Sequence, residues 1–105
     1  MASQEINDRR GWTHGEATHY WDGLSGNLMA DGKTKYWPDQ SGLVAATGWP
    51  LGTILYVCGP TKRCLSVEVR DTGRFPKTDL DFSEMDQMVL GGYLGRFPIE
   101  IREGR

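Results

Sequence analysis

Two aspartates ten residues apart are the side chains of this sequence best placed for acid–base chemistry. Asp71 follows a strand-like run that ends at Arg70, and Asp81 comes just before a short helical pattern that opens at Ser83. Both carboxylates are therefore expected to leave the ends of ordered elements on either side of a polar loop. Carboxylates presented in this way can transfer protons to and from a bound substrate. The nearby Asp79 is expected to be solvated.

Each of the two aspartates also has a purely structural interpretation. Asp81 could be a carboxylate that leads into a helix and favours the positive end of its dipole. Asp71 could be a turn aspartate that hydrogen-bonds its own backbone. The residue types and spacing alone leave both interpretations open.

A predicted β-hairpin leads into Asp71. The runs Ile54–Val57 and Leu65–Arg70 read as strands, and the bend between them contains glycine and proline, which predicts a hairpin with a five-residue connection. Cys58 and Cys64 flank that bend, so their Cα atoms could lie within the range of a disulfide. The alternative is a pair of buried free thiols, and the hairpin geometry favours the bridge.

A helix over residues 83–90 is the clearest local signal after the hairpin. Ser83 is a favourable N-cap, and Gly91-Gly92 end the pattern. Met85, Met88 and Val89 recur at spacings of three and four, which predicts that they form one buried face.

The rest of the chain reads as strands joined by turns. Further strands are expected over residues 15–22, 43–46 and 97–102, and the first strand of the hairpin is expected within residues 53–58. Residues 23–41 form a long turn-rich loop with enough apolar side chains to be ordered. Residues 1–13 are expected to be a flexible N-terminal arm, and residues 14–105 a single domain. The predicted fold is mainly β, a small barrel of six strands with one short helix.

Composition excludes several classes of function. The net charge of −2 argues against nucleic acid as a partner. No apolar run approaches the roughly 20 residues of a membrane span. Two cysteines and two histidines are too few and wrongly spaced for a zinc motif, and no metal or cofactor is expected. No secretory signal is visible, so either it was removed or the protein reaches its target without one, as lysis and virion proteins do.

Several short motifs occur in an order that resembles the double-psi β-barrel domains of rare lipoprotein A, expansins, family 45 endoglucanases and the bacterial three-aspartate domain. They are Gly15–Tyr20, Ala45-Ala46, Pro50–Thr53, Val69–Phe75, Asp81–Ser83 and Leu90-Gly91. Each motif is weak alone, but together they span residues 15–102. The resemblance implies a six-stranded barrel with an open groove that binds a β-linked glycan.

The same resemblance implies roles for individual residues. Asp81 falls on the acid of these families, and Asp71 on the aspartate of the Asp-Thr-Gly motif, which is also expected in the groove. Substrate contacts are expected from Glu16, Thr18, Tyr20, Trp21 and Thr47. The peptidoglycan-cleaving members commonly carry histidine at the position of Thr47. Threonine can donate a hydrogen bond to a sugar but cannot act as a base near neutral pH.

Residues Thr18 to Asp22 resemble the Thr-Arg-Tyr-Trp-Asp signature of family 45 endoglucanases, in which the aspartate is the general base. An inverting hydrolase needs two carboxyl groups about 6.5–9.5 Å apart, and Asp22 with Asp81 could be that pair. Against this, His19 replaces the arginine, and those cellulases are longer and far richer in cysteine. Asp22 can equally be a turn residue beside Gly23.

The sequence therefore predicts a barrel that acts on cell-wall glycan. The most specific prediction is a peptidoglycan lytic transglycosylase in which Asp81 acts as acid and base. The charge of Asp71 would raise the proton affinity of Asp81. The alternatives are a β-1,4-glucan endoglucanase with Asp22 as base and Asp81 as acid, and a non-catalytic module of the expansin or virion type that only binds glycan. The protein is expected to be a monomer that is secreted, held in the cell envelope, or delivered to the wall for lysis.

Overall fold

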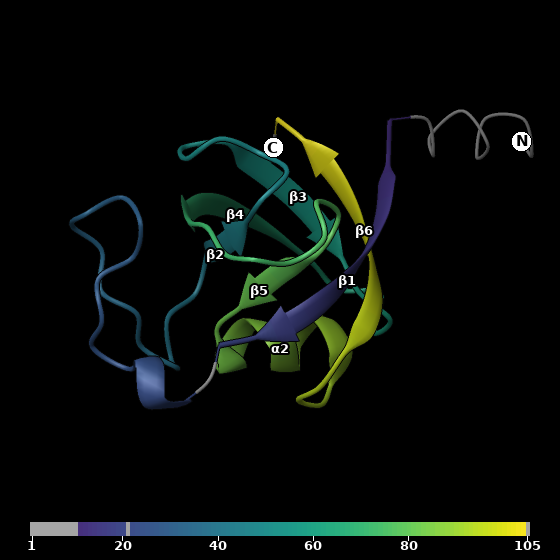
Figure 1. The fold of residues 1–105 in the computed structure, drawn as a ribbon. Coiled ribbons are helices and arrows are strands. Elements are labelled where there is room, and N and C mark those ends of the chain that lie inside the picture. The colour runs from purple at the N-terminus through teal and green to yellow at the C-terminus, as the bar shows by residue number, and fades with distance from the viewer. Residues whose placement is uncertain (1–10, 21, 105) are drawn as a thin grey trace, which may run out of the picture.

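Six strands close into a barrel in the order β1-β5-β2-β4-β3-β6 (Figure 1). The computed structural model describes residues 11–20 and 22–104, except for the side chain of Asp22. The elements in that part of the chain are β1 (Thr13–His19), η1 (Asp22–Leu24, a 3-10 helix), β2 (Leu43–Ala46), β3 (Ile54–Cys58), β4 (Cys64–Asp71), β5 (Leu80–Phe82), α2 (Glu84–Gly91) and β6 (Phe97–Glu103). The predicted fold class, a mainly β barrel of six strands with one short helix, is confirmed.

Two strand pairs in the barrel are parallel and the other four are antiparallel. β1 runs parallel to β5, with Ala17 opposite Leu80, and β2 runs parallel to β4, with Val44 opposite Val69. Parallel neighbours cannot be joined by a tight hairpin and need a long crossover. In both parallel pairs the crossover contains other strands: β2, β3 and β4 between β1 and β5, and β3 between β2 and β4.

Two apolar clusters fill the fold, one inside the barrel and one outside it. The inner cluster takes the inward-facing residues of all six strands together with Leu90 of α2. The outer cluster contains Tyr20, Met29, Tyr36 and Ala45, all nearly inaccessible to solvent. Because Met29 and Tyr36 belong to the predicted loop of residues 23–41, this loop packs against the outside of the barrel.

β5 is a strand that the sequence did not reveal. The residues from Asp81 onward read as the opening of a helix, but Leu80–Phe82 pairs with both β1 and β2. The helix begins only at Glu84, and Ser83 is its N-cap, with a side chain that accepts a hydrogen bond from Asp86 N. A strand of three residues is too short to establish an alternating pattern, and its neighbours on both sides come from distant parts of the chain.

The expected buried face of α2 is wrong. Met85 and Met88 are 45% and 48% exposed, whereas Asp86, Gln87 and Leu90 are buried. Asp86 turns inward because its carboxylate accepts hydrogen bonds from Ser41 Oγ at 2.7 Å and from the backbone N–H of Gly42 at 2.8 Å. The helix is thus held by polar contacts to the segment that precedes β2.

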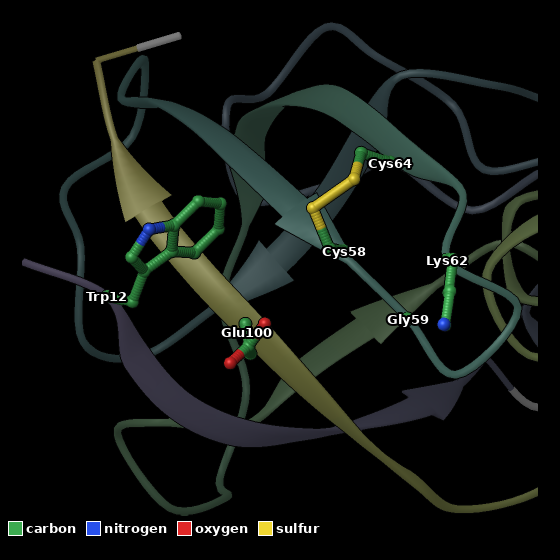
Figure 2. A pocket seen from close by; sticks show the side chains of 6 residues that line it. All are labelled: Trp12, Cys58, Gly59, Lys62, Cys64 and Glu100. Atoms are coloured by element: carbon green, nitrogen blue, oxygen red, sulfur yellow. A yellow bond between two sulfur atoms is a disulfide. The ribbon is translucent and has the colours of Figure 1, made fainter. Parts of the chain in front are cut away.

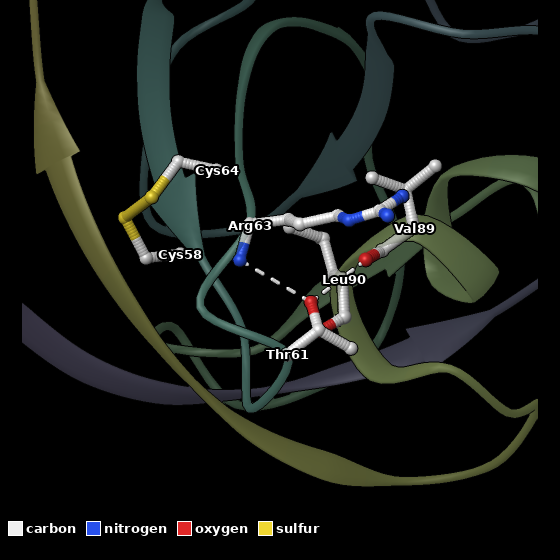
Figure 3. Close-up of a disulfide and its surroundings, with 6 residues drawn as sticks. All are labelled: Cys58, Thr61, Arg63, Cys64, Val89 and Leu90. Carbon is white, nitrogen blue, oxygen red and sulfur yellow. Dashed lines mark hydrogen bonds between the residues drawn. A yellow bond between two sulfur atoms is a disulfide. The ribbon is translucent and has the colours of Figure 1, made fainter.

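The predicted hairpin joins β3 and β4 through residues 59–63, and the last pair of its ladder is Cys58 with Cys64. These two cysteines form a disulfide with a Cα–Cα distance of 4.1 Å. Figure 3 shows that the hairpin connection reaches the end of α2, where Thr61 Oγ1 lies 2.9 Å from the carbonyl oxygens of both Val89 and Leu90. The connection therefore caps carbonyls at the C-terminal end of the helix.

The expected N-terminal arm of residues 1–13 stays a prediction. β1 begins at Thr13, and residues 1–10 lie outside the described part of the chain. The strand ends at His19, earlier than the expected residue 22. Among the described residues, no helix has the length and apolar character to cross a membrane.

Candidate functional site

A row of side chains crosses the outer face of four neighbouring strands. Thr18 of β1 pairs with Asp81 of β5, Asp81 pairs with Ala45 of β2, and Ala45 pairs with Asp71 of β4. The residues on either side of Asp81 point into the core, so Asp81 itself points outward. The two aspartates are thus two strand spacings apart, about 9.5 Å between their backbones. We call these four residues the outer row.

Asp81 is partly buried and receives one side-chain hydrogen bond. Thr18 Oγ1 donates to Asp81 Oδ1 at 2.8 Å. Burial raises the pKa of the Asp81 carboxyl above its ordinary value, and the charge of Asp71 adds to this rise, whereas the hydrogen bond from Thr18 and the nearby His19 lower the pKa. The net direction is upward, so this carboxyl keeps a proton at pH values where an exposed aspartate has lost it.

Asp71 is a carboxylate with fixed partners. Its Oδ2 accepts a hydrogen bond from the Tyr20 hydroxyl at 2.8 Å. Its Oδ1 accepts from the backbone N–H groups of Ala30 at 2.8 Å and of Thr72 at 2.9 Å. The bond from Thr72 N–H is a local turn contact, as expected for a turn aspartate that hydrogen-bonds its own backbone. The bonds from Tyr20 and Ala30, however, join β4 to distant segments, so Asp71 also anchors the loop after β1.

Tyr20 extends the site from the outer row toward the loop of residues 23–41. Its ring stacks on Tyr36 with the centroids 4.2 Å apart. Burial, followed by the charge of Asp71 and the hydrogen bond to it, raises the pKa of Tyr20 well above its ordinary value. The hydroxyl therefore remains a proton donor throughout the physiological range, and the ring forms part of the wall beside the row.

Glu16 belongs to a second group of charges next to the outer row. Arg96 Nη1 donates to Glu16 Oε1 at 2.6 Å and to Asp79 Oδ2 at 3.0 Å. Asp79 is only 4% exposed, so the expectation that it is solvated is wrong. Its charge is compensated by Arg96, which lies 17 positions further along the chain, and no local sequence pattern indicates that pairing.

The other expected site residues are distributed differently. Thr47 is exposed, and its Oγ1 donates to the carbonyl oxygen of Gly73 at 2.8 Å, so it ties the turn after β2 to the loop after β4. Asp22 begins the 3-10 helix η1, but its side chain lies outside the described part of the structure, as does all of Trp21. Their predicted roles as base and as substrate contact stay predictions.

A shallow cleft of about 360 Å³ opens elsewhere on the surface, beside the disulfide (Figure 2). It is lined by Trp12, Cys58, Gly59, Lys62, Cys64 and Glu100. Arg102 lies over the Trp12 ring, 5.0 Å from its centroid. This cleft contains no residue of the outer row. No group of three or more histidine, cysteine, aspartate or glutamate side chains in the described residues could hold a metal ion.

The sequence matches no family model and no curated protein, but its fold matches solved structures. The expansin of Clavibacter michiganensis in its apo form is 29% identical, with a TM-score of 0.66 over 90% of this chain and 50% of that chain. A mutant of the same expansin in complex with cellohexaose is 26% identical, with a TM-score of 0.61 and the same coverage. The chain spans about half the length of these expansin chains.

A third match is the Streptomyces papain inhibitor, with 22% identity and a TM-score of 0.67. The alignment covers 90% of this chain and 94% of the inhibitor. At that identity the match shows a shared fold and nothing about shared activity. Together with the closed barrel of six strands, these matches show that the chain is a double-psi β-barrel domain that resembles expansin.

Proposed function

We propose that the outer row binds a β-1,4-linked glycan of the cell wall and that the protein cleaves peptidoglycan as a lytic transglycosylase. The observation that carries this proposal is the state of Asp81. Its carboxyl is partly buried, its pKa is raised, and Thr18 bonds only Oδ1. Oδ2 thus remains available to carry a proton toward a substrate on the outer face.

A single carboxyl group of this kind can do both proton transfers of the reaction. Protonated Asp81 gives its proton to the glycosidic oxygen as the bond from C1 to that oxygen breaks. The resulting carboxylate then takes the proton of the 6-hydroxyl group on the same sugar, while O6 forms a bond to C1. The products are a glycan with a new free hydroxyl group and a 1,6-anhydro sugar, and no water is consumed.

The neighbours of Asp81 suit these two steps. The hydrogen bond from Thr18 stabilises the carboxylate that exists between the steps, while burial favours the protonated form that begins the reaction. Asp71 accepts hydrogen bonds from three donors, two at Oδ1 and one at Oδ2. Its role would be to place a negative charge near Asp81 and to position Tyr20, whose hydroxyl it binds.

A second candidate is an expansin-like module that binds glycan without cleaving it. The similarity to expansin, including the structure of that protein with cellohexaose, favours this possibility. Thr47, where peptidoglycan-cleaving proteins carry histidine, points the same way. Either function would place the protein in the cell envelope or at the wall of a target cell.

Product analysis separates these functions. The protein is incubated with purified peptidoglycan and, separately, with cellulose, and the soluble products are identified by mass spectrometry. Anhydro-muropeptides that are absent with Asp81→Asn would support the transglycosylase. Reducing cellodextrins would indicate an endoglucanase and bring Asp22 back as its base. Sedimentation with either polymer without any product would leave the binding module and overturn the proposed activity.

A further inference from the structure

Arg96 extends the outer row by one position on the side of β6. In the antiparallel pair of β1 and β6, Ala17 lies opposite Phe97. The next pair along the same register places Arg96 opposite Thr18, which in turn lies beside Asp81. A positively charged side chain thus stands next to the residue pair on which the proposed reaction depends.

The guanidinium of Arg96 is held by two ion pairs that both involve Nη1. Only Nη1 donates to Glu16 and Asp79, and Nε and Nη2 donate to none of the described residues. The side chain of Arg96 is 55% exposed, and that of Glu16 is 48% exposed. The side chain of Asp79 is only 6% exposed, so Asp79 is the buried member of this ion-pair group. Within the described residues, Glu16 also bonds through Oε1 alone, so its Oε2 can accept a hydrogen bond beside the remaining donors of Arg96.

A fixed donor beside a fixed acceptor matches the polar groups of a sugar ring. A hydroxyl group can accept from Arg96 and donate to Glu16 at the same time, and charged partners make such hydrogen bonds stronger than neutral ones. Because both side chains are already held by their ion pair, little conformational entropy is lost when they bind. The arrangement suits a hydroxyl group better than a carboxylate, since the three side chains together carry one positive and two negative charges.

We infer that Arg96 and Glu16 form a subsite that binds a free hydroxyl group of a hexopyranose, adjacent to the ring on which Asp81 acts. This inference rests on the proposed function and adds a substrate preference to it. An N-acetylmuramic acid ring fits less well there, because its O3 carries a lactyl ether in place of a hydroxyl group and so offers one donor fewer to Glu16. The preferred ring is therefore N-acetylglucosamine of peptidoglycan or glucose of a β-glucan.

The test is a binding experiment in a background that cannot cleave. In Asp81→Asn protein, isothermal titration calorimetry measures the affinity for the hexamers of N-acetylglucosamine and of glucose. Arg96→Lys keeps a positive charge beside Asp79 but loses the planar fork, and Glu16→Ala removes the acceptor. The matched control is Arg63→Lys, on the exposed hairpin connection beside the disulfide (Figure 3).

Each subsite variant should weaken the binding of at least one hexamer on the order of 10-fold, the effect of one lost hydrogen bond to a charged group. The control should bind as the background does. Loss for one hexamer alone identifies the sugar that the subsite takes. Unchanged affinity for both hexamers in both subsite variants would overturn the inference but would not affect the proposal that Asp81 cleaves the glycan. The same holds if the Asp81→Asn background protein binds neither hexamer. Absence of cleavage by the parent, with the expected binding losses, would overturn the proposed activity alone.

Discussion

The Asp81 carboxyl is subject to two opposing influences at the scale of the single residue. Burial favours its protonated form, and the hydrogen bond from Thr18 favours its charged form. A group that must first donate a proton and then accept one benefits from both. The proposed chemistry thus depends on the position of Asp81 between β1 and β2, where its strand neighbours are inside the core.

Replacing Asp81 by asparagine should abolish cleavage but preserve binding. Asp81→Asn keeps the shape of the side chain and can still accept from Thr18, but it has no transferable proton. The turnover of peptidoglycan should fall by about 10²–10⁴-fold, while the affinity for insoluble glycan stays close to that of the parent. Asp39→Asn, at an exposed position of the loop, is the control. Full activity of Asp81→Asn would show that another residue is the acid.

The same substitution should change how stability depends on pH. Because the folded protein holds the Asp81 proton more tightly than the unfolded chain, the folded state binds more protons between the two pKa values. The free energy of unfolding due to this group is therefore highest below the unfolded pKa and decreases as the pH rises through the folded pKa. Asp81→Asn has no carboxyl group at this position, so its stability lacks this pH-dependent decrease. The difference between the Tm of Asp81→Asn and the Tm of the parent should therefore increase from acidic to neutral pH. Calorimetry at a series of pH values measures this, and a Tm difference independent of pH would contradict it.

At the scale of elements, α2 is an example of a helix that is positioned by polar contacts. Its buried Asp86 accepts from the segment before β2, and the side chain of Gln87 bonds the backbone N–H of Gly95 at 2.9 Å. The exposed methionines lie on the opposite side. The helix thereby links the segment that enters β2 to the turn that precedes β6, the two strands on either side of the β1–β5 pair.

Asp86→Ala should therefore destabilise the protein more than a substitution at either methionine. It leaves the partly buried N–H of Gly42 and the hydroxyl of Ser41 without their acceptor, which costs on the order of 2–4 kcal/mol. Met88→Gln, on the exposed face, should remain within about 0.5 kcal/mol of the parent. Urea unfolding measures both changes. Equal losses for the two variants would mean that the methionine face is covered in solution.

The disulfide acts on a second element, the hairpin of β3 and β4. The loop that it closes is short, so in the chain-entropy account it should add about 2 kcal/mol to the free energy of unfolding. Alkylation of the denatured, unreduced protein should find no reactive thiol, and Cys58→Ser combined with Cys64→Ser should lower the free energy of unfolding by that amount. Two reactive thiols in the parent would contradict the bridge.

At the scale of the whole molecule, the fold consists of a closed barrel with a second, smaller core attached to its outer face. Asp71 stands between the two, because it belongs to β4 and accepts hydrogen bonds from Tyr20 and Ala30. Arg70 beside it forms an ion pair with Asp31 of the same loop at 3.4 Å. The wall of the proposed glycan site is therefore tied to the barrel at the end of β4, while the far end of the loop is bonded to Ser83 and α2.

Asp71→Asn should loosen that wall. An asparagine offers a neutral acceptor to Ala30, and its amide nitrogen would face the Tyr20 hydroxyl in place of an acceptor. Hydrogen exchange of the Ala30 amide should accelerate on the order of 10-fold, as the loss of one charge-assisted bond implies. Loss of the Asp71 charge also lowers the pKa of Asp81. The alkaline limb of the pH–activity profile should therefore move to lower pH. Unchanged exchange in the loop would show that the apolar contacts of Tyr36 are sufficient.

Much of this structure could be predicted from the sequence because the signals are local. The hairpin, the N-cap at Ser83 and the bounds of β2 all depend on residues within a few positions of one another. The alternation of β6 is equally local, since every second side chain of a half-buried strand faces the core. The six-stranded barrel followed from the order of short motifs that resemble the double-psi domains, and comparison with solved structures confirmed that resemblance.

Contacts between distant segments were decided by the tertiary structure alone. Asp81 and Thr18 are 63 positions apart, and Arg96 and Glu16 are 80 apart. No periodicity connects such residues, so the sequence presented Asp79 as solvated and did not reveal Arg96. The same reason explains the helix face: the methionine spacing is a local pattern, whereas the burial of Asp86 depends on donors more than 40 residues away. Residue types and spacing thus selected Asp71 and Asp81, and only the closure of the barrel determined that one is an anchored charge and the other a partly buried acid.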